Sequence, residues 1–173
     1  WGEMQTDPNF GNYLVRLGDG STTPDKIILL DFGAVRDFPE DLMTLARALT
    51  KASVLRQREL LVSSMKGFGF FDEMSIDNKQ KIADLCLLAV EPFTELQDTP
   101  PEIIDEHGNY IWAKSNLHKR VLVQGAKSAA TKEFSVPPKE LMFISRKFIG
   151  AYTFMTVIDA RIYGFDIIKP FLK

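Results

Sequence analysis

Two short apolar runs near the N-terminus flank a loop of turn-forming residues, and this arrangement constrains the fold more than any other feature. The runs span residues 13–17 and 26–30, and both are rich in residues that favour β-strands. The loop between them, residues 18–25, reads Gly-Asp-Gly-Ser-Thr-Thr-Pro-Asp. Two apolar runs around such a loop predict an antiparallel β-hairpin.

The predicted hairpin brings two polar side chains together at its open end. Pairing about the centre of the loop places Tyr13 opposite Leu30, so that Asn12 and Asp31 meet just beyond the strands. An amide oxygen and a carboxylate suit Mg²⁺, which takes a few hard oxygen ligands and keeps waters and phosphates as the others. Asp7 precedes Asn12 on a tight Asp-Pro-Asn-Phe-Gly turn, which places a second carboxylate beside the metal.

The order of these groups is that of a protein kinase C-terminal lobe, in which an Asp faces the acceptor and a later Asn and an Asp-Phe-Gly hold metal. The surrounding residues make the resemblance specific. Residues 4–12, Met-Gln-Thr-Asp-Pro-Asn-Phe-Gly-Asn, and residues 29–36, Leu-Leu-Asp-Phe-Gly-Ala-Val-Arg, resemble the aarF-domain or UbiB-type atypical kinases, which support ubiquinone biosynthesis in bacteria and mitochondria. A late stretch that begins Val-Pro-Pro-Lys-Glu-Leu and includes Arg146 and Lys147 is similar to a late helix of that family.

The resemblance implies a role for each polar group of the motif. Asn12 and Asp31 would hold Mg²⁺ between the β- and γ-phosphates of ATP. Asp7 would orient or deprotonate the acceptor, a water or a hydroxyl, and so act as the catalytic residue. Three further residues would lie near the nucleotide phosphates: Asn9, Phe32 and Gly33. Asn9 stands where ordinary protein kinases place a Lys, so it can donate a hydrogen bond but adds no positive charge.

The rest of the chain has the pattern of helices. Pro39 and the acids after it suit a helix start, and apolar residues then recur at helical spacing. Four further helices are predicted over residues 56–65, 78–90, 115–131 and 139–162. We therefore expect a mostly α-helical fold with one small β-hairpin, a protein-kinase-like C-terminal lobe without its N-lobe. Residues 1–38 would carry the catalytic loop, hairpin and Asp-Phe-Gly segment, and residues 39–173 a helical subdomain.

The sequence lacks the parts of a kinase that cover the nucleotide. It contains no G-x-G-x-x-G loop, and neither the Lys-x-Gly-Gln motif nor the Ala-rich loop that the resembled family carries in its N-terminal part. The chain also does not start at Met, and its first motif begins almost at once. We therefore expect a piece of a longer protein, whose first partner is the missing N-lobe of the same protein. Alone, this piece should bind ATP weakly or not at all and be inactive.

Composition limits the partners and the compartment. The formal net charge of −2 gives no broad attraction for nucleic acid, so we expect no nucleic-acid partner. The lone Cys86 lies among apolar residues, which predicts a core thiol and fits a reducing compartment. The longest nearly apolar run, residues 148–158, is too short to span a bilayer. The resemblance implies a protein that is cytoplasmic or peripheral to the membrane, and mitochondrial in a eukaryote.

A basic helix near Arg120 has two interpretations. It carries five cationic residues: Lys114, Lys119, Arg120, Lys127 and Lys132. A solvated face is the favoured interpretation. The alternative is a peripheral contact with an anionic membrane, because the resembled family is thought to act near lipid and polyprenyl substrates. The partners implied are then lipids or enzymes of the ubiquinone pathway.

The favoured function is that of an aarF/UbiB-type atypical kinase or ATPase that depends on Mg²⁺ and ATP and supports ubiquinone or related lipid biosynthesis. No long activation segment and no Ala-Pro-Glu follow Gly33, which argues against a protein substrate. One alternative is a small-molecule phosphotransferase of the aminoglycoside or choline kinase type, although these usually have His before the first Asp, where this chain has Gln5 and Thr6. The other is a non-catalytic kinase-like scaffold, which predicts no ATPase activity even in the complete chain.

Overall fold

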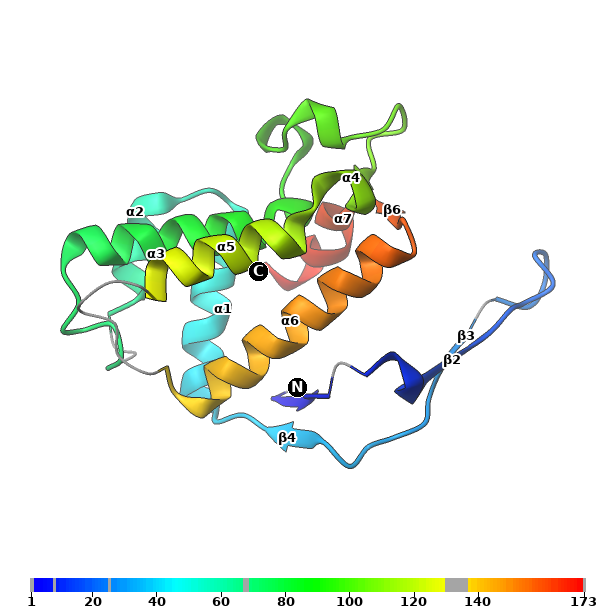
Figure 1. The fold of residues 1–173 in the computed structure, drawn as a ribbon, viewed down its shortest axis with the longest axis horizontal. Helices are drawn as coiled ribbons and strands as arrows, with labels where there is room; N and C mark the ends of the chain where they lie inside the picture. The colour runs from blue at the N-terminus through cyan, green and yellow to red at the C-terminus, as the bar shows by residue number, and fades with distance from the viewer. Residues whose placement is uncertain (1, 8, 25, 67–68, 130–136, 173) are drawn as a thin grey trace.

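Helices dominate the computed structural model, which describes residues 2–7, 9–24, 26–66, 69–129 and 137–172 (Figure 1). The helices are α1 (Glu40–Val54), α2 (Arg58–Ser64), α3 (Ile76–Ala89), α4 (Trp112–Ser115), α5 (Leu117–Ala129), α6 (Lys139–Val157) and α7 (Gly164–Ile168). Single 3₁₀ turns occur at Phe10–Asn12, Glu91–Phe93, Leu96–Asp98, Pro101–Ile103 and Lys169–Phe171. The prediction of a mostly helical fold is therefore confirmed.

The strands form three small antiparallel sheets instead of the single hairpin that the sequence predicted. They pair β1 (Glu3–Gln5) with β4 (Val35–Asp37), β2 (Tyr13–Arg16) with β3 (Lys26–Leu29), and β5 (Tyr110–Ile111) with β6 (Arg161–Ile162). Among the described strands, only β2 and β3 are neighbouring runs of the chain. The other two sheets pair segments of two or three residues that are distant in sequence, and such short segments show no periodic pattern of their own.

Two helix starts follow the capping chemistry that the sequence indicates. Helix α1 begins at Glu40 directly after Pro39, and its first turn holds two acids near the positive end of the helix. Residues 34–39 alone separate Gly33 from α1, so there is no length for a long activation segment. Helix α3 begins after Ser75, whose hydroxyl accepts a hydrogen bond from the Asn78 N–H.

Helix α6 ends earlier than predicted. It stops at Val157 instead of Ile162, because the chain turns at Asp159, whose φ of 47° is left-handed. The residues that follow form β6 beside β5, and the Trp112 N–H donates to the Ala160 carbonyl at 3.1 Å. The predicted end of α5 near residue 131 lies outside the described residues, as do Lys132, Val136 and Phe68.

Two clusters of buried side chains make the described core. The first lies between α1, α2 and α3 and consists of Ala52, Leu61, Met65, Phe71, Met74 and Ala83. The second joins α4, α5 and α6 to the preceding loop and consists of Ile103, Tyr110, Trp112, Leu117 and Tyr152. Figure 1 shows α3 and α5 lying side by side, with α6 below them, between these two helices and the N-terminal strands.

An ion pair to a buried carboxylate ties α5 to the turn that follows α3. The Arg120 guanidinium donates to both oxygens of Glu91, at 2.8 and 2.7 Å, and the Tyr110 hydroxyl donates to the same carboxylate at 2.7 Å. The Glu91 side chain is only 6% exposed, whereas that of Arg120 is 40% exposed. The Arg120 guanidinium therefore supplies the cation that a buried carboxylate requires, although 40% of the Arg120 side chain stays exposed. The interpretation of this helix as a solvated face or a membrane contact stays a prediction.

Replacing Arg120 by Met should lower the free energy of unfolding by about 2–4 kcal/mol, because Glu91 would stay buried without its cation. Urea denaturation followed by circular dichroism measures the change. Lys119→Met is the matched control, since it removes a charge from an exposed position of the same helix and should change stability by less than about 0.5 kcal/mol. Equal effects of the two substitutions would contradict the proposed cost of the unpaired carboxylate.

Cys86 should resist alkylation in the folded protein. It packs against the first cluster, and burial raises the pKa of its thiol from 9.0 to about 11. At pH 8 the folded thiol should react with iodoacetamide roughly 100-fold more slowly than the unfolded one, because the thiolate is the reactive form. The raised pKa also means that the folded state loses stability as pH rises from 9 to 11, and not below 9. Equal alkylation rates with and without denaturant would contradict this.

Candidate active site between two antiparallel ladders

The first ladder brings the chain before Asp7 against the chain after the Asp-Phe-Gly segment. Strand β1 pairs with β4, with Gln5 opposite Val35 at the end nearer the site. Thr6 extends this contact, because its N–H and its hydroxyl both donate to the Ala34 carbonyl, at 3.0 and 2.8 Å. Thr6 is buried. These bonds hold the segment before Asp7 against the segment after the Asp-Phe-Gly turn, one residue before Asp7.

The second ladder is the hairpin, and its register differs by one residue from the prediction. Tyr13 lies opposite Leu29 and not Leu30, so Asn12 lies opposite Leu30 and its carbonyl accepts the Leu30 N–H at 2.8 Å. Asp31 follows directly after this contact. The predicted meeting of Asn12 and Asp31 across the strands is therefore offset by one position.

The hairpin loop explains the shifted register. Its backbone winds around Asp19, whose carboxylate accepts hydrogen bonds from the N–H groups of Ser21, Thr22 and Thr23. These bonds hold the pKa of Asp19 well below its ordinary value. Gly18 lies so close to the returning chain that a Cβ there would be 1.7 Å from the Thr23 carbonyl oxygen. Leu17 is consequently part of the loop and not of the strand, which moves the centre of the hairpin by half a residue.

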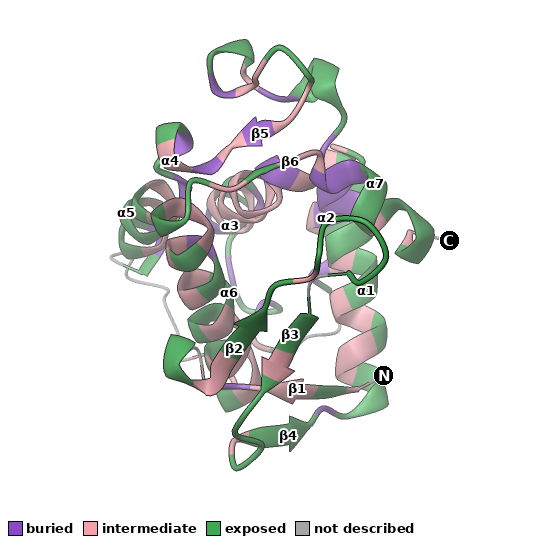
Figure 2. Ribbon diagram, turned by 90° about the vertical axis from the view of Figure 1, so that its right-hand side faces the viewer, coloured by how far each residue is buried: buried purple, intermediate pink, exposed green. Residues whose placement is uncertain are grey.

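Between the two ladders, residues 6–12 and 30–34 are tethered side by side at both ends. In Figure 2 the hairpin β2–β3 lies in front of β1–β4, and Figure 1 shows the connecting segments that separate the two ladders. Asp7 and Asn12 lie in the first of these segments and Asp31 lies in the second, directly after the contact between Leu30 and Asn12. That the three side chains handle one nucleotide stays a prediction.

Asp7 and Asn12 are in direct contact. The Asn12 side-chain amide donates to Asp7 Oδ2 at 2.8 Å, and the Asn9 N–H donates to Asp7 Oδ1 at 3.2 Å. Both side chains are half-buried. Because the Asn12 amide nitrogen faces Asp7, its Oδ1 is the atom left to accept or to ligate.

Asp31 lies in the segment opposite and is exposed. Its Oδ1 accepts the Gly33 N–H at 2.7 Å, a bond within the Asp-Phe-Gly turn. A Cβ at Gly33 would lie 3.1 Å from that oxygen, so glycine lets the turn close on the carboxylate. Phe32, between them, is 63% exposed. Across the described residues, no hydrogen bond joins Asp31 to Asp7 or Asn12.

Asn9 shapes the loop through its side chain. Its Oδ1 accepts the Gly11 N–H at 3.0 Å and so caps the 3₁₀ turn that leads to Asn12. The next residue, Phe10, stacks on Phe154 of α6, with ring centroids 4.7 Å apart. The Asn9 oxygen is therefore used to build the loop, and only its amide nitrogen could meet a phosphate.

Helix α6 contacts the loop through two cationic side chains. Lys147 approaches the Asp7 carbonyl and Arg146 approaches the Asp7 carboxylate. The Lys147 ammonium donates to Gln5 Oε1 at 3.1 Å, to the Asp7 carbonyl at 3.3 Å and to the Tyr13 hydroxyl at 2.6 Å. Arg146 lies 3.9 Å from Asp7 Oδ1. The sequence resemblance singled out both basic residues, but their contact with Asp7 could not be foreseen from residues 140 positions away.

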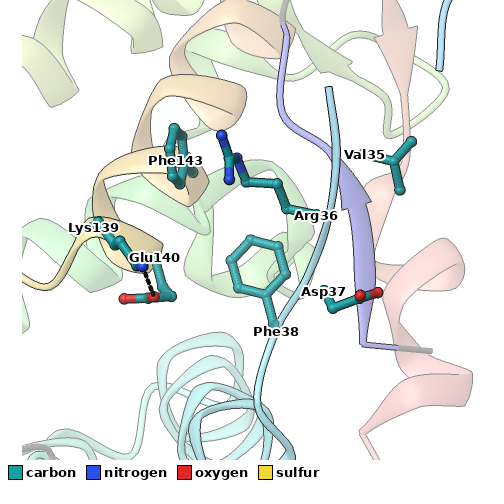
Figure 3. A pocket seen from close by; sticks show the side chains of 7 residues that line it. All are labelled: Val35, Arg36, Asp37, Phe38, Lys139, Glu140 and Phe143. Carbon is teal, nitrogen blue, oxygen red and sulfur yellow. Dashed lines mark ion pairs between the residues drawn. The ribbon is translucent and has the colours of Figure 1, made fainter. Parts of the chain in front are cut away.

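The start of α6 is anchored on β4. A shallow pocket of about 320 Å³ lies between them, lined from β4 by Arg36 and from α6 by Phe143 (Figure 3). The Arg36 guanidinium lies over the Phe143 ring, 4.6 Å from its centroid, a cation–π contact. Figure 3 also shows Lys139 beside Glu140, with the ion pair at 3.9 Å. The contact between Arg36 and Phe143 holds the strand that follows the Asp-Phe-Gly segment against the helix that carries Lys147.

The donor set fits a hard divalent cation held in part by other ligands. Asn12 and Asp31 offer one amide oxygen and one carboxylate, which suit Mg²⁺ when phosphates and waters complete its shell. Within the described ranges, no group of three His, Cys, Asp or Glu side chains is placed to hold a metal alone. A cation at this site would therefore depend on the nucleotide for ligands.

Comparison with known proteins gives two matches. Residues 1–65, which include both N-terminal ladders, α1 and α2, match the family described as the ABC1 atypical kinase-like domain. The whole chain is similar to a protein of Saccharomyces cerevisiae, named atypical kinase COQ8, mitochondrial, with 29% identity over 167 residues. That alignment covers 96% of this chain and 30% of the yeast protein. The chain thus spans under a third of the length of the relative it matches.

Both matches include residues of the two N-terminal ladders. They support the resemblance drawn from the sequence motifs, because both the matched family and the similar yeast protein are described as atypical kinases. The similarity to the yeast protein continues past residue 65 into the helical part. In the described part of the chain, none of the helices combines the length and apolar character needed to cross a membrane.

Thr6→Val tests the closure of the site. The substitution keeps the shape of the side chain but removes one of two hydrogen bonds to the Ala34 carbonyl, which should cost about 1 kcal/mol of unfolding free energy. Hydrogen exchange of the Thr6 and Val35 amides should rise with it. Thr44→Val, at an exposed position of α1, is the control. Unchanged exchange at Thr6 would show that the hydroxyl does not hold the ladder.

Proposed function

We propose that the protein is an atypical kinase or ATPase that acts on Mg-ATP, with Asp7, Asn12 and Asp31 as the residues that handle the nucleotide. The observation that carries this proposal is the 2.8 Å hydrogen bond between Asn12 and Asp7 in a loop tethered beside the Asp-Phe-Gly segment. A carboxylate, an amide oxygen and a second carboxylate in one short region are the groups that phosphoryl transfer requires.

Asp7 would act on the acceptor. Its two oxygens each accept one hydrogen bond within the loop, which fixes the plane of the carboxylate and leaves further lone pairs free. An oriented carboxylate can accept the proton of a water or a hydroxyl group as that group attacks the terminal phosphate. The Arg146 guanidinium lies 3.9 Å from Asp7 Oδ1.

Asn12 and Asp31 would hold the cation. The hydrogen bond from Asn12 to Asp7 sets the amide so that its oxygen is the free atom, and the bond from Gly33 to Asp31 restrains one carboxylate oxygen. When bound, Mg²⁺ neutralises charge on the phosphates of the nucleotide. The amide nitrogen of Asn9 and the exposed Phe32 and Gly33 would line the path of the phosphates, with less positive charge than an ordinary kinase provides.

The exposed hairpin suggests where the rest of a nucleotide site would dock. Strands β2 and β3 project from the helical body in Figure 1, and nearly all their residues are exposed. Five of the apolar side chains on the hairpin are at least 47% exposed: Leu14, Val15, Leu17, Ile27 and Leu29. Contiguous exposed apolar surface marks an interaction site. We place there the N-lobe that the sequence predicts as partner, with the phosphate-covering loop that this chain lacks.

The biological setting follows from the resemblance. The related family supports ubiquinone biosynthesis, so we propose that this or a related lipid pathway is the one served, with the lipids or the enzymes of that pathway as partners. The yeast relative is a mitochondrial protein by name, which favours the same compartment for a eukaryotic protein and the cytoplasm for a bacterial one. A peripheral membrane contact through α5 would have to use its lysines alone, because Arg120 is bound to Glu91.

Asp31→Asn in the complete protein should lower Mg²⁺-dependent ATP hydrolysis by roughly 100-fold or more, because a preorganised charge at the phosphates would be lost. Asp37→Asn, which removes an exposed carboxylate from the neighbouring strand β4, is the matched control and should keep the parent rate. Phosphate release measured over a range of Mg²⁺ concentrations checks both variants.

A fluorescent nucleotide titration separates the remaining functions. The complete protein should give a Mg²⁺-dependent signal, and residues 1–173 alone should give little or none. A complete protein without ATPase activity and without nucleotide binding would make it a non-catalytic scaffold. Parent-level hydrolysis by the Asp31→Asn variant would remove Asp31 from the role proposed for it.

A further inference from the structure

The Lys147 ammonium has three N–H donors, and all three are used on the loop that carries Asp7. One acceptor is the carbonyl of Asp7 itself. The other two flank it, Gln5 at the end of β1 and Tyr13 at the start of β2. The ammonium therefore bridges the two ladders across the stretch of chain that neither ladder pairs.

The three acceptors of Lys147 are all neutral: an amide oxygen, a peptide carbonyl and a phenol. A lysine on a surface helix commonly pairs with a carboxylate, and here the positive charge is instead left without a direct anionic partner among the described residues. It lies 3.3 Å from the Asp7 carbonyl oxygen, so the contact acts on the position of the Asp7 peptide group.

Gln5 shows how strongly this contact shapes the loop. Its oxygen faces Lys147 because an ammonium can only donate. Its Nε2 is consequently buried and has no hydrogen-bond partner within the described part of the chain. Native proteins rarely leave a buried donor unpaired, because its desolvation is not compensated. The hydrogen bond from Lys147 to Gln5 therefore coexists with the desolvation cost of the unpaired Gln5 Nε2.

Helix α6 is itself fixed to both sides of the site. Phe143 lies under Arg36 of β4, and Phe154 stacks on Phe10 of the loop. Phe143, Lys147 and Phe154 are separated by four and seven residues, so they lie on one stripe of the helix. The contacts of Phe143 and Phe154 restrain the helix on either side of Lys147 in sequence. They therefore restrain the position of the Lys147 ammonium relative to the loop.

We propose that Lys147 is a positioning residue for Asp7: it holds the Asp7 peptide group and thereby aims the carboxylate at the acceptor. The inference rests on the function proposed above and deepens it. Misplacing a reacting group by about 1 Å can cost roughly 100-fold in rate, so loss of the ammonium should affect turnover far more than nucleotide affinity.

The test uses the complete protein with Lys147→Met, which keeps the apolar stem of the side chain and removes the donors. We expect kcat for Mg²⁺-dependent ATP hydrolysis to fall roughly 10- to 100-fold, while KM for ATP changes by less than about threefold, because Lys147 donates to neither the Asn12 side chain nor Asp31. Lys139→Met is the matched control, since the Lys139 side chain is 81% exposed at the start of the same helix. Its kcat should equal that of the parent.

Chemical rescue separates the ammonium from packing. Lys147→Cys, made in a background without other reactive cysteines, should be as slow as Lys147→Met. Alkylation with bromoethylamine replaces bromide by the cysteine sulfur and rebuilds an ammonium of nearly the same reach, which should restore most of kcat. Tyr13→Phe removes one acceptor, and the double variant with Lys147→Met should be no slower than Lys147→Met alone.

Hydrogen exchange gives a readout that does not depend on activity. In Lys147→Met the amides of Thr6, Asn12 and Leu30, all hydrogen-bonded around the loop, should exchange several-fold faster than in the parent, while those of α3 should not change. If the parent protein has no ATPase activity, the proposed function fails. Faster exchange in Lys147→Met than in that parent would then still support the positioning contact.

Two results would overturn the positioning role. One is a folded Lys147→Met variant with kcat within about twofold of the parent. The other is unchanged exchange in the loop, which would show that the ammonium does not hold it. A variant that only melts at a lower temperature, with parent kcat well below that temperature, would likewise assign Lys147 to stability alone.

Discussion

The pairing of β1 with β4 is the contact on which the arrangement of the site depends. It involves three residues on each strand, extended by Thr6 and its two bonds to the Ala34 carbonyl. Without it, the hairpin would hold only one end of the loop, and the chain after Asp-Phe-Gly would have no fixed path to α1. With it, both segments that carry functional groups are restrained at both ends, which lowers the entropy that binding would otherwise have to remove.

The sequence predicted those features of the fold that depend on local chemistry. Pro39 and the acids after it marked the start of α1, Ser75 capped α3, and the alternation of apolar runs and turn residues marked the hairpin. Each of these signals acts within a few residues of the element that it specifies. The family resemblance was also readable from sequence, because the two motifs are contiguous and keep their order.

What the sequence could not give depends on distance along the chain. The Glu91–Arg120 pair and the β5–β6 sheet join segments 29 and about 50 residues apart. The periodicity of apolar residues along the sequence does not predict such contacts. The predicted register of the hairpin was wrong for a different reason. Side-chain bonding to Asp19 and the close approach at Gly18 moved Leu17 out of the strand, and a symmetric reading of the loop does not include such bonds.

Helix α6 connects the helical core with the N-terminal loop. One stripe of the helix touches the loop and β4, whereas Tyr152, on another side, is buried among the aromatic rings of the second cluster and donates its hydroxyl to the Ala89 carbonyl. Movement of the helix in that cluster would be transmitted directly to the peptide of Asp7. Inherited or engineered changes deep in the helical interior would then alter the geometry around Asp7 in a protein that remains folded, and a survey of variants confined to the N-terminal loop would overlook them.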